Sequence, residues 1–130
     1  MDLVIEPVTS FSWARFKAAL KGEGIQPPKT RPPFGLMLTA PLAKKRRPIA
    51  GACLYPIADI VLLLYPFSVA WEKPEMTAEL APHIANLGAT LANLAFLIHG
   101  CGIVAMPREE SDVLALQAMG FSKPIAGLAR

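Results

Sequence analysis

The longest apolar pattern in the chain runs from Pro82 to His99 and predicts a helix, because apolar residues recur there at helical spacing. The apolar ridge consists of Ile84, Leu87, Leu91, Leu94 and Ile98, and beside it runs a track of small residues, Ala85, Gly88, Ala92 and Ala95. Pro82 suits a first helical turn, and Gly100 suits the position after the last turn. We interpret this segment as a core helix whose small track lets another backbone approach closely. A dimer or membrane packing face is the alternative.

A short strand and a second helix follow. The apolar run from Cys101 to Met106 predicts a buried strand, and Ser111 to Met119 predicts a helix capped by Ser111 or Glu109. Gly120 ends this helix before Phe121. No Lys, Arg, Asp or Glu occurs between Leu80 and Arg108, so this region must be covered by the domain, a partner or a bilayer.

The first half of the chain reads mainly as strands. The predicted strands are Leu3–Val8, Phe34–Thr39, Ile49–Tyr55 and Asp59–Val69, with a helix from Ser10 or Ser12 to about Leu20 after the first. Prolines 27, 28, 32 and 33 exclude a helix from the next connection. The run up to Val69 is apolar without alternation, as in a strand covered on both faces. Pro66 within it indicates a bulge or a place where two strands part.

Composition narrows the class of protein. A chain of 130 residues, 53% of them hydrophobic, forms one domain spanning 1–130. The net charge of +3 does not indicate nucleic-acid binding, and the cluster Lys44–Arg47 is either a solvated loop or a contact for an anionic cofactor. Cys53 and Cys101 lack further ligands at metal spacing, so we expect reduced thiols and no metal. The N-terminus lacks a secretory signal, which predicts a cytoplasmic protein.

The strand, the helix and the closing Gly-Phe, SDVLALQAMGF, resemble the last third of the GCN5-related N-acetyltransferase (GNAT) fold. The resemblance implies an α/β (α+β) domain with a mixed, mostly antiparallel sheet flanked by helices. It also implies that the strand containing Pro66 separates from its neighbour, with the backbone of Phe67, Ser68 and Val69 facing an acyl-CoA cofactor. The proline-rich segment would then be either a substrate loop or a surface connector.

The residues that bind the cofactor in that family are not matched. The segment AWEKPEMTAELAP stands where the family has a glycine-rich diphosphate loop, and Glu72, Glu75 and Glu79 would repel a diphosphate. Leu116 stands where many members place a tyrosine general acid, and Glu109 falls on a family asparagine. The residues left for proton transfer are Tyr55, Tyr65, His83, His99, Asp59 and Glu72, each of which has a structural reading as well. His83 could bind an anion in the first helical turn, and His99 could cap the end of its helix.

Three functional hypotheses follow from these observations. The first is a divergent GNAT-like domain that has lost ordinary acetyl-CoA binding, needs no cofactor, and acts as a structural or interaction component. It would contact a protein partner or a second copy through the charge-free helix. Its location would be the cytoplasm, or a virion, because GNAT-like domains with degenerate cofactor motifs resemble small bacteriophage proteins. The second is an active N-acyltransferase that uses acetyl-CoA. The third is a membrane hairpin spanning the bilayer at Ile49–Trp71 and Ile84–Met106.

Overall fold

The computed structural model describes residues 2–42, 44–69, 74–99, 103–121 and 128–129. Its strands are β1 (Val4–Pro7), β2 (Phe34–Leu42), β3 (Lys45–Ile57), β4 (Ile60–Ser68), β5 (Ile103–Ala105) and β6 (Leu128–Ala129). Its helices are α1 (Trp13–Gly22), α2 (Pro74–His99) and α3 (Glu110–Ala118).

The described strands form one sheet in the order β1-β2-β3-β4-β5-β6. Neighbouring strands are antiparallel except β4 and β5, which are parallel and are joined through α2. A parallel pair needs a crossover connection of this kind. The predicted mixed, mostly antiparallel sheet flanked by helices is confirmed.

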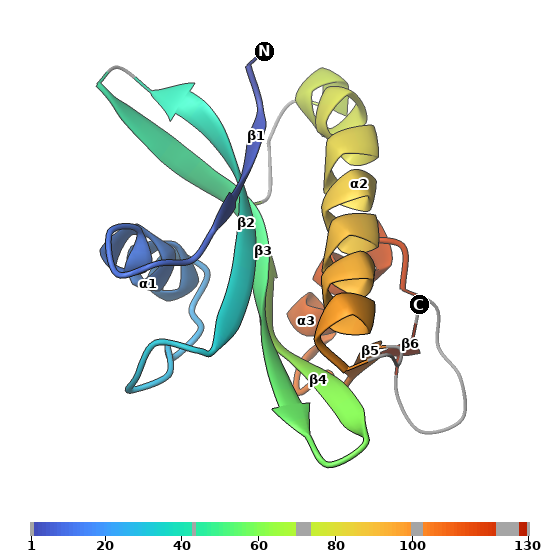
Figure 1. The fold of residues 1–130 in the computed structure, drawn as a ribbon. Helices are drawn as coiled ribbons and strands as arrows, with labels where there is room; N and C mark the ends of the chain where they lie inside the picture. The colour runs from blue at the N-terminus through green and yellow to red at the C-terminus, as the bar shows by residue number, and fades with distance from the viewer. Residues whose placement is uncertain (1, 43, 70–73, 100–102, 122–127, 130) are drawn as a thin grey trace.

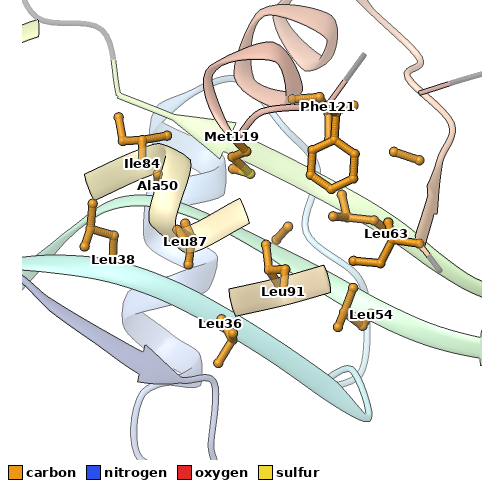
Figure 2. Packing of buried hydrophobic residues seen from close by; sticks show 14 of the residues in the cluster. Leu36, Leu38, Ala50, Leu54, Leu63, Ile84, Leu87, Leu91, Met119 and Phe121 are labelled. Atoms are coloured by element: carbon orange, nitrogen blue, oxygen red, sulfur yellow. The ribbon is translucent and has the colours of Figure 1, made fainter. Parts of the chain in front are cut away.

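Helices cover both faces of the sheet, with α1 on one face and α2 and α3 on the other (Figure 1). Successive residues of β2 point to opposite faces, so Leu36 and Leu38 belong to the core under α2 while Met37 belongs to the core under α1. The α2 side holds the larger core, in which Leu54, Leu63, Leu87, Leu91 and Phe121 gather (Figure 2). The absence of alternation in the apolar runs follows from this double coverage.

A bulge interrupts β4 at the position that Pro66 predicted. Gly51 pairs with Phe67 and Cys53 with Leu64, so Tyr65 and Pro66 together oppose the single residue between those two on β3. Tyr65 has a φ of 57°, a left-handed conformation that is uncommon for a non-glycine residue. The extra residue reverses the facing of the strand: Leu63 packs under α2, whereas Phe67 packs under α1.

The start of α2 differs from the prediction. The helix begins at Pro74, and Pro82 lies inside it. Both Pro74 and Pro82 could occupy the first turn of a helix. Glu75 follows Pro74, and an acidic residue in the first turn favours a helix start there. Pro82 has no N–H, so the carbonyl of Ala78 lacks the donor that it would otherwise have within the helix. Ala78 is exposed, so water can donate to this carbonyl instead.

The small residues of α2 pack against another segment of the same domain. A Cβ atom on Gly88 would overlap the backbone carbonyl of Met119, directly after α3. The predicted close approach of another backbone is therefore confirmed, and at Gly88 this backbone comes from the same chain.

The Gly-Phe sequence ends α3 through a Schellman motif. The N–H of Phe121 donates to the carbonyl of Leu116 at 3.0 Å, and the N–H of Gly120 donates to Gln117 at 3.0 Å. Gly120 adopts a φ of 91°, which glycine tolerates best. Phe121 is 3% exposed and belongs to the core that includes Ile103, so its predicted burial near the strand after α2 is confirmed.

The membrane hairpin is not favoured by this fold. Within Ile49–Trp71, the described residues form parts of the strands β3 and β4 instead of a spanning helix. In the described part of the chain one helix, Pro74–Ile98, is long and apolar enough to cross a membrane; its mean hydropathy is 1.3, and 28% of its apolar 18-residue window is buried. Leu80, Leu87, Leu91 and Ala95 of this helix are buried in the domain core, as expected of a helix packed on a sheet.

Candidate functional site

The candidate site lies where β4 and β5 separate. Within the described residues, β4 pairs with β5 at Val61, Leu62 and Leu63, and β4 then continues to Ser68. The N–H of Val69 donates to the carbonyl of Ile49 at 2.8 Å. Because backbone groups alternate direction along an antiparallel strand, Ser68 directs its N–H and C=O away from β3, toward the side that β5 has left. The separation predicted around Pro66 is present.

A hollow of about 440 Å³ opens beside this end of β4. We call it the apolar hollow; it is lined by Glu23, Ser68, Val69, Thr77, Leu80, Ala81, Ile84, Ser111, Leu114, Ala115 and Ala118. The walls from α2 and α3 are aliphatic, and three hydroxyl groups add polarity. Among the described residues, Glu23 is the only charged residue in this lining.

Two of the three residues predicted to face a cofactor line the apolar hollow. Ser68 and Val69 do so, whereas Phe67 does not. The Phe67 ring is 1% exposed and packs against Phe16 of α1, with ring centroids 5.5 Å apart. The bulge at Tyr65 explains this difference, because it turns the Phe67 side chain to the opposite face of the sheet.

A second hollow, of about 350 Å³, lies between α1, β3 and the end of β4. We call it the basic hollow; it is lined by Arg15, Ala18, Ala19, Gly22, Glu23, Arg47, Pro48 and Val69. Glu23 and Val69 line both hollows, so the two meet around these residues.

Glu23 is held at the end of α1 by a second Schellman motif. The N–H of Ile25 donates to Leu20 at 2.9 Å, the N–H of Gly24 donates to Lys21 at 3.0 Å, and Gly24 has a φ of 76°. Ile25 and Leu20 are both buried in the core under α1. The backbone of Glu23 is therefore fixed where the two hollows meet, and the residue is exposed.

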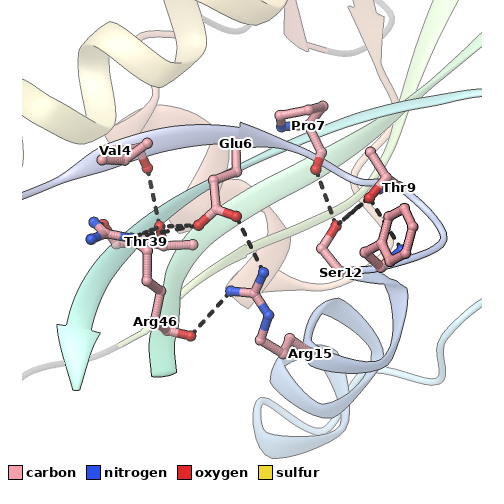
Figure 3. A network of polar contacts seen from close by, with 9 residues as sticks. Val4, Glu6, Pro7, Thr9, Ser12, Arg15, Thr39 and Arg46 are labelled. Carbon is pink, nitrogen blue, oxygen red and sulfur yellow. Dashed lines mark hydrogen bonds and ion pairs between the residues drawn. The ribbon is translucent and has the colours of Figure 1, made fainter. Parts of the chain in front are cut away.

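A polar network holds Arg15 in place beside the basic hollow (Figure 3). Its guanidinium donates to the carboxylate of Glu6 and to the carbonyl of Arg46, both at 3.2 Å. Glu6 also accepts a hydrogen bond from Thr39 at 2.5 Å and pairs with Arg46 at 3.6 Å. Burial raises the pKa of Glu6, but the hydrogen bonds from Thr39 and Arg15 and the charges of Arg15 and Arg46 outweigh burial, so the net pKa is lowered.

The four residues of the basic cluster Lys44–Arg47 lie in different environments. Lys44 and Lys45 are exposed, as expected of a solvated turn. Arg46 belongs to the network, because it donates to Thr39 and to the carbonyl of Asp2. Arg47 lines the basic hollow.

The residues that sequence reasoning retained for proton transfer lie elsewhere. Tyr55 and Tyr65 are partly buried and pack against the core under α1. Burial, followed by the charges of Cys53 and Tyr65, raises the pKa of Tyr55 to about 12. The Arg108 guanidinium lies over the Tyr65 ring, with Cζ 5.2 Å from the ring centroid. Asp59 is exposed in the turn before β4. His83 is exposed, as expected of a lone surface histidine, but it lies inside α2 and not in the first turn where the sequence placed it.

Some predicted groups fall outside the described residues or in the core. Glu72, Cys101, Gly100 and the His99 side chain lie outside them, although α2 does end at His99. Burial raises the pKa of the Cys53 thiol to about 12, which makes it unreactive at neutral pH. Leu116 is buried in the core, and Glu109 is the exposed residue that precedes α3. Over the described ranges, no three His, Cys, Asp or Glu side chains are grouped so that they could hold a metal ion.

Sequence reasoning missed Arg15 and Glu23, and it named Arg47 only as part of the cluster Lys44–Arg47. The only local signal was the sequence Gly22-Glu23-Gly24 at the end of a predicted helix. Nothing local indicates that α1 and β3 bring these three side chains around Val69.

Comparison with solved structures identifies the fold. A crystal structure from Exiguobacterium sp. 255-15, described as a "putative acetyltransferase", matches 99% of this chain and 91% of its own, with a TM-score of 0.56 and 16% sequence identity. At that identity the likeness establishes the fold alone: this chain shares the fold of that structure, in agreement with the predicted α/β domain with a mixed, mostly antiparallel sheet. Comparisons with protein-family models and with curated proteins find no match.

Proposed function

We propose that this chain is a GNAT-like domain that has lost ordinary acetyl-CoA binding and acts as an interaction component. The observation that carries this proposal is the charge of the apolar hollow beside the start of α2. Its described lining contains an anion, Glu23, and no cation. The cations Arg15 and Arg47 line the basic hollow, to which no described residue of α2 contributes. A ligand with a diphosphate needs several N–H donors and cationic side chains around it.

The start of α2 adds to the same argument. Pro74 occupies the first helical position and has no N–H to donate, and Glu75 follows it in the first turn. A carboxylate near a helix N-terminus stabilises the helix but competes with a bound phosphate for the same positive field. We therefore expect acetyl-CoA to bind more weakly than about 1 mM, equivalent to less than about 4 kcal/mol of binding free energy.

Calorimetric titration of the full chain with acetyl-CoA tests the loss of cofactor binding. A parallel titration with S-acetylpantetheine, which lacks the phosphates, separates the hollow from the phosphate contacts. The expected result is no micromolar binding of acetyl-CoA, and no advantage of acetyl-CoA over the phosphate-free compound. Micromolar binding of acetyl-CoA that is lost in the phosphate-free compound would contradict the proposal.

The proposed contact surface is the C-terminal half of α2, and the proposed partner is a second copy of this chain. Phe96 is 64% exposed and Leu97 is 80% exposed. Because the helix carries no charge between Leu80 and His99, two copies can meet there without repulsion between like charges.

Sedimentation equilibrium at increasing concentration tests this surface. We expect a dimer that Leu97→Lys dissociates, because a buried ammonium without a partner opposes association. Phe11→Lys is the matched control, since Phe11 is 95% exposed and lies before α1. A wild-type chain that stays monomeric at high concentration contradicts the proposed surface.

One observation favours an active N-acyltransferase as the second candidate. The backbone of Ser68 faces the apolar hollow where β4 and β5 separate, a geometry that can pair with the amides of an extended ligand. The acetyl-CoA titration decides between the two candidates, because an enzyme of this type must bind its acyl donor.

A further inference from the structure

We propose that the two hollows around Val69 form one binding site for a zwitterionic dipeptide whose first residue has an apolar side chain. The hollows share Glu23 and Val69, so one ligand can extend from one into the other. This site is separate from the proposed contact surface on α2 and requires no acyl donor.

In the basic hollow, small residues of α1 lie between the positive charge of Arg15 and the negative charge of Glu23. Arg15, Ala19 and Glu23 lie along one side of α1, at intervals of four residues. Arg15 and Glu23 are thus about 12 Å apart along the helix axis, and Ala18, Ala19 and Gly22 leave space between them. Arg47 approaches the same space from β3. A ligand lying here meets guanidinium groups at one end and a carboxylate at the other.

Glu23 is well suited to hold an ammonium group. It follows the last turn of α1, where the helix dipole disfavours a negative charge. Among the described residues, the Glu23 side chain has no hydrogen-bond or ion-pair partner. A carboxylate in an electrostatically unfavourable place, facing two hollows, is typical of a residue retained for binding.

Arg15 is prepared to hold an acid group. Glu6 and the carbonyl of Arg46 fix its guanidinium with two of its five N–H donors. Its side chain keeps 32% of its exposure, so it stays accessible to a ligand. A guanidinium fixed in this way loses little conformational entropy when it binds a carboxylate.

The apolar hollow supplies the third part of the site. Leu80, Ile84 and Leu114 line it from α2 and α3, beyond the shared residue Glu23. A ligand whose ammonium contacts Glu23 can place an aliphatic side chain there. The site therefore selects for three features together: an ammonium, an acid group and an apolar side chain.

Chemical-shift mapping and titration of the full chain with leucylglycine test this site. We expect binding with shifts in residues that line the hollows. N-acetyl-leucylglycine lacks the ammonium, leucylglycinamide lacks the acid group, and glycylglycine lacks the apolar side chain, so each should bind at least about tenfold more weakly than leucylglycine. Leucylglycinamide or N-acetyl-leucylglycine binding as tightly as leucylglycine would overturn the proposal, as would the absence of leucylglycine binding.

Three variants complete the test. Glu23→Gln and Arg47→Gln should each weaken binding at least about tenfold, because each removes one charged contact. Asp59→Asn is the matched control, because Asp59 is exposed in the turn before β4 and lines neither hollow. Circular dichroism confirms that each variant is folded. Unchanged affinity in folded Glu23→Gln overturns the proposal, whereas micromolar acetyl-CoA binding overturns only the proposed loss of the cofactor.

Discussion

The two faces of the sheet are built differently. The face under α2 and α3 is closed by aliphatic side chains and by the contact of Gly88 with the Met119 backbone. The face under α1 has a smaller apolar core and carries the network of Glu6, Arg15 and Arg46 at its edge. The first face therefore holds most of the apolar packing and the walls of the apolar hollow, whereas the second face holds the charged network beside the basic hollow.

The largest expected effect concerns Phe121, on the α2 side of the sheet. Phe121→Ala should lower the free energy of unfolding by about 3–5 kcal/mol, because it leaves a cavity beside Leu63 in the larger core. Chemical denaturation measures this loss. Phe11→Ala is the control and should change stability by less than about 0.5 kcal/mol, since Phe11 is 95% exposed. A loss below about 1 kcal/mol for Phe121→Ala would mean that the Gly-Phe turn does not anchor α3.

The second effect concerns the packing of α2 on α3. Gly88→Ala should destabilise the domain by about 1–3 kcal/mol, because the added methyl group must displace the backbone at Met119. Gly22→Ala is the matched control, since a Cβ there meets nothing within 4 Å. Thermal unfolding of both variants measures the difference. Equal melting temperatures for the two variants would show that α2 and α3 are not in tight contact.

The same comparison explains what the sequence could predict. Elements set by local rules were found: the helix that ends at Gly120 and Phe121, and the bulge that Pro66 requires. The start of α2 was placed wrongly because two prolines, Pro74 and Pro82, both satisfy the rule for a first turn.

The candidate site was predicted only in part for a different reason. Ser68 and Val69 follow from the separation of β4 and β5, which the resemblance implied. For Phe67 the prediction concerned its backbone; its side chain lies on the opposite face of the sheet because of the bulge, and the number of extra residues cannot be read from Pro66 alone. Glu23 and Arg47 come together only through the packing of α1 on β3, which is a tertiary contact.

The third prediction concerns pH and the α1 side of the sheet. Since the pKa of Glu6 is lowered in the folded state from its usual 4.5, the ionised carboxylate stabilises the domain above that value, and this stabilisation is lost as pH falls through the lower folded pKa. Glu6→Gln should therefore cost about 1–2 kcal/mol at pH 7 and progressively less below pH 4.5. Denaturation at several pH values measures both. A cost that does not change with pH would show that Glu6 contributes shape and not charge.

The smallest expected effect has the opposite sign and separates stability from binding most sharply. Glu23→Gln removes a negative charge from the C-terminal end of α1, so it should raise the free energy of unfolding by about 0.3–1 kcal/mol. The same variant should lose affinity for a zwitterionic ligand, because the hollows then lack a carboxylate for its ammonium group. Thermal unfolding and ligand titration on one sample measure both changes. A variant that is less stable than the wild type would place Glu23 among the structural residues of the α1 side, together with Glu6, and would remove the reason to separate the two.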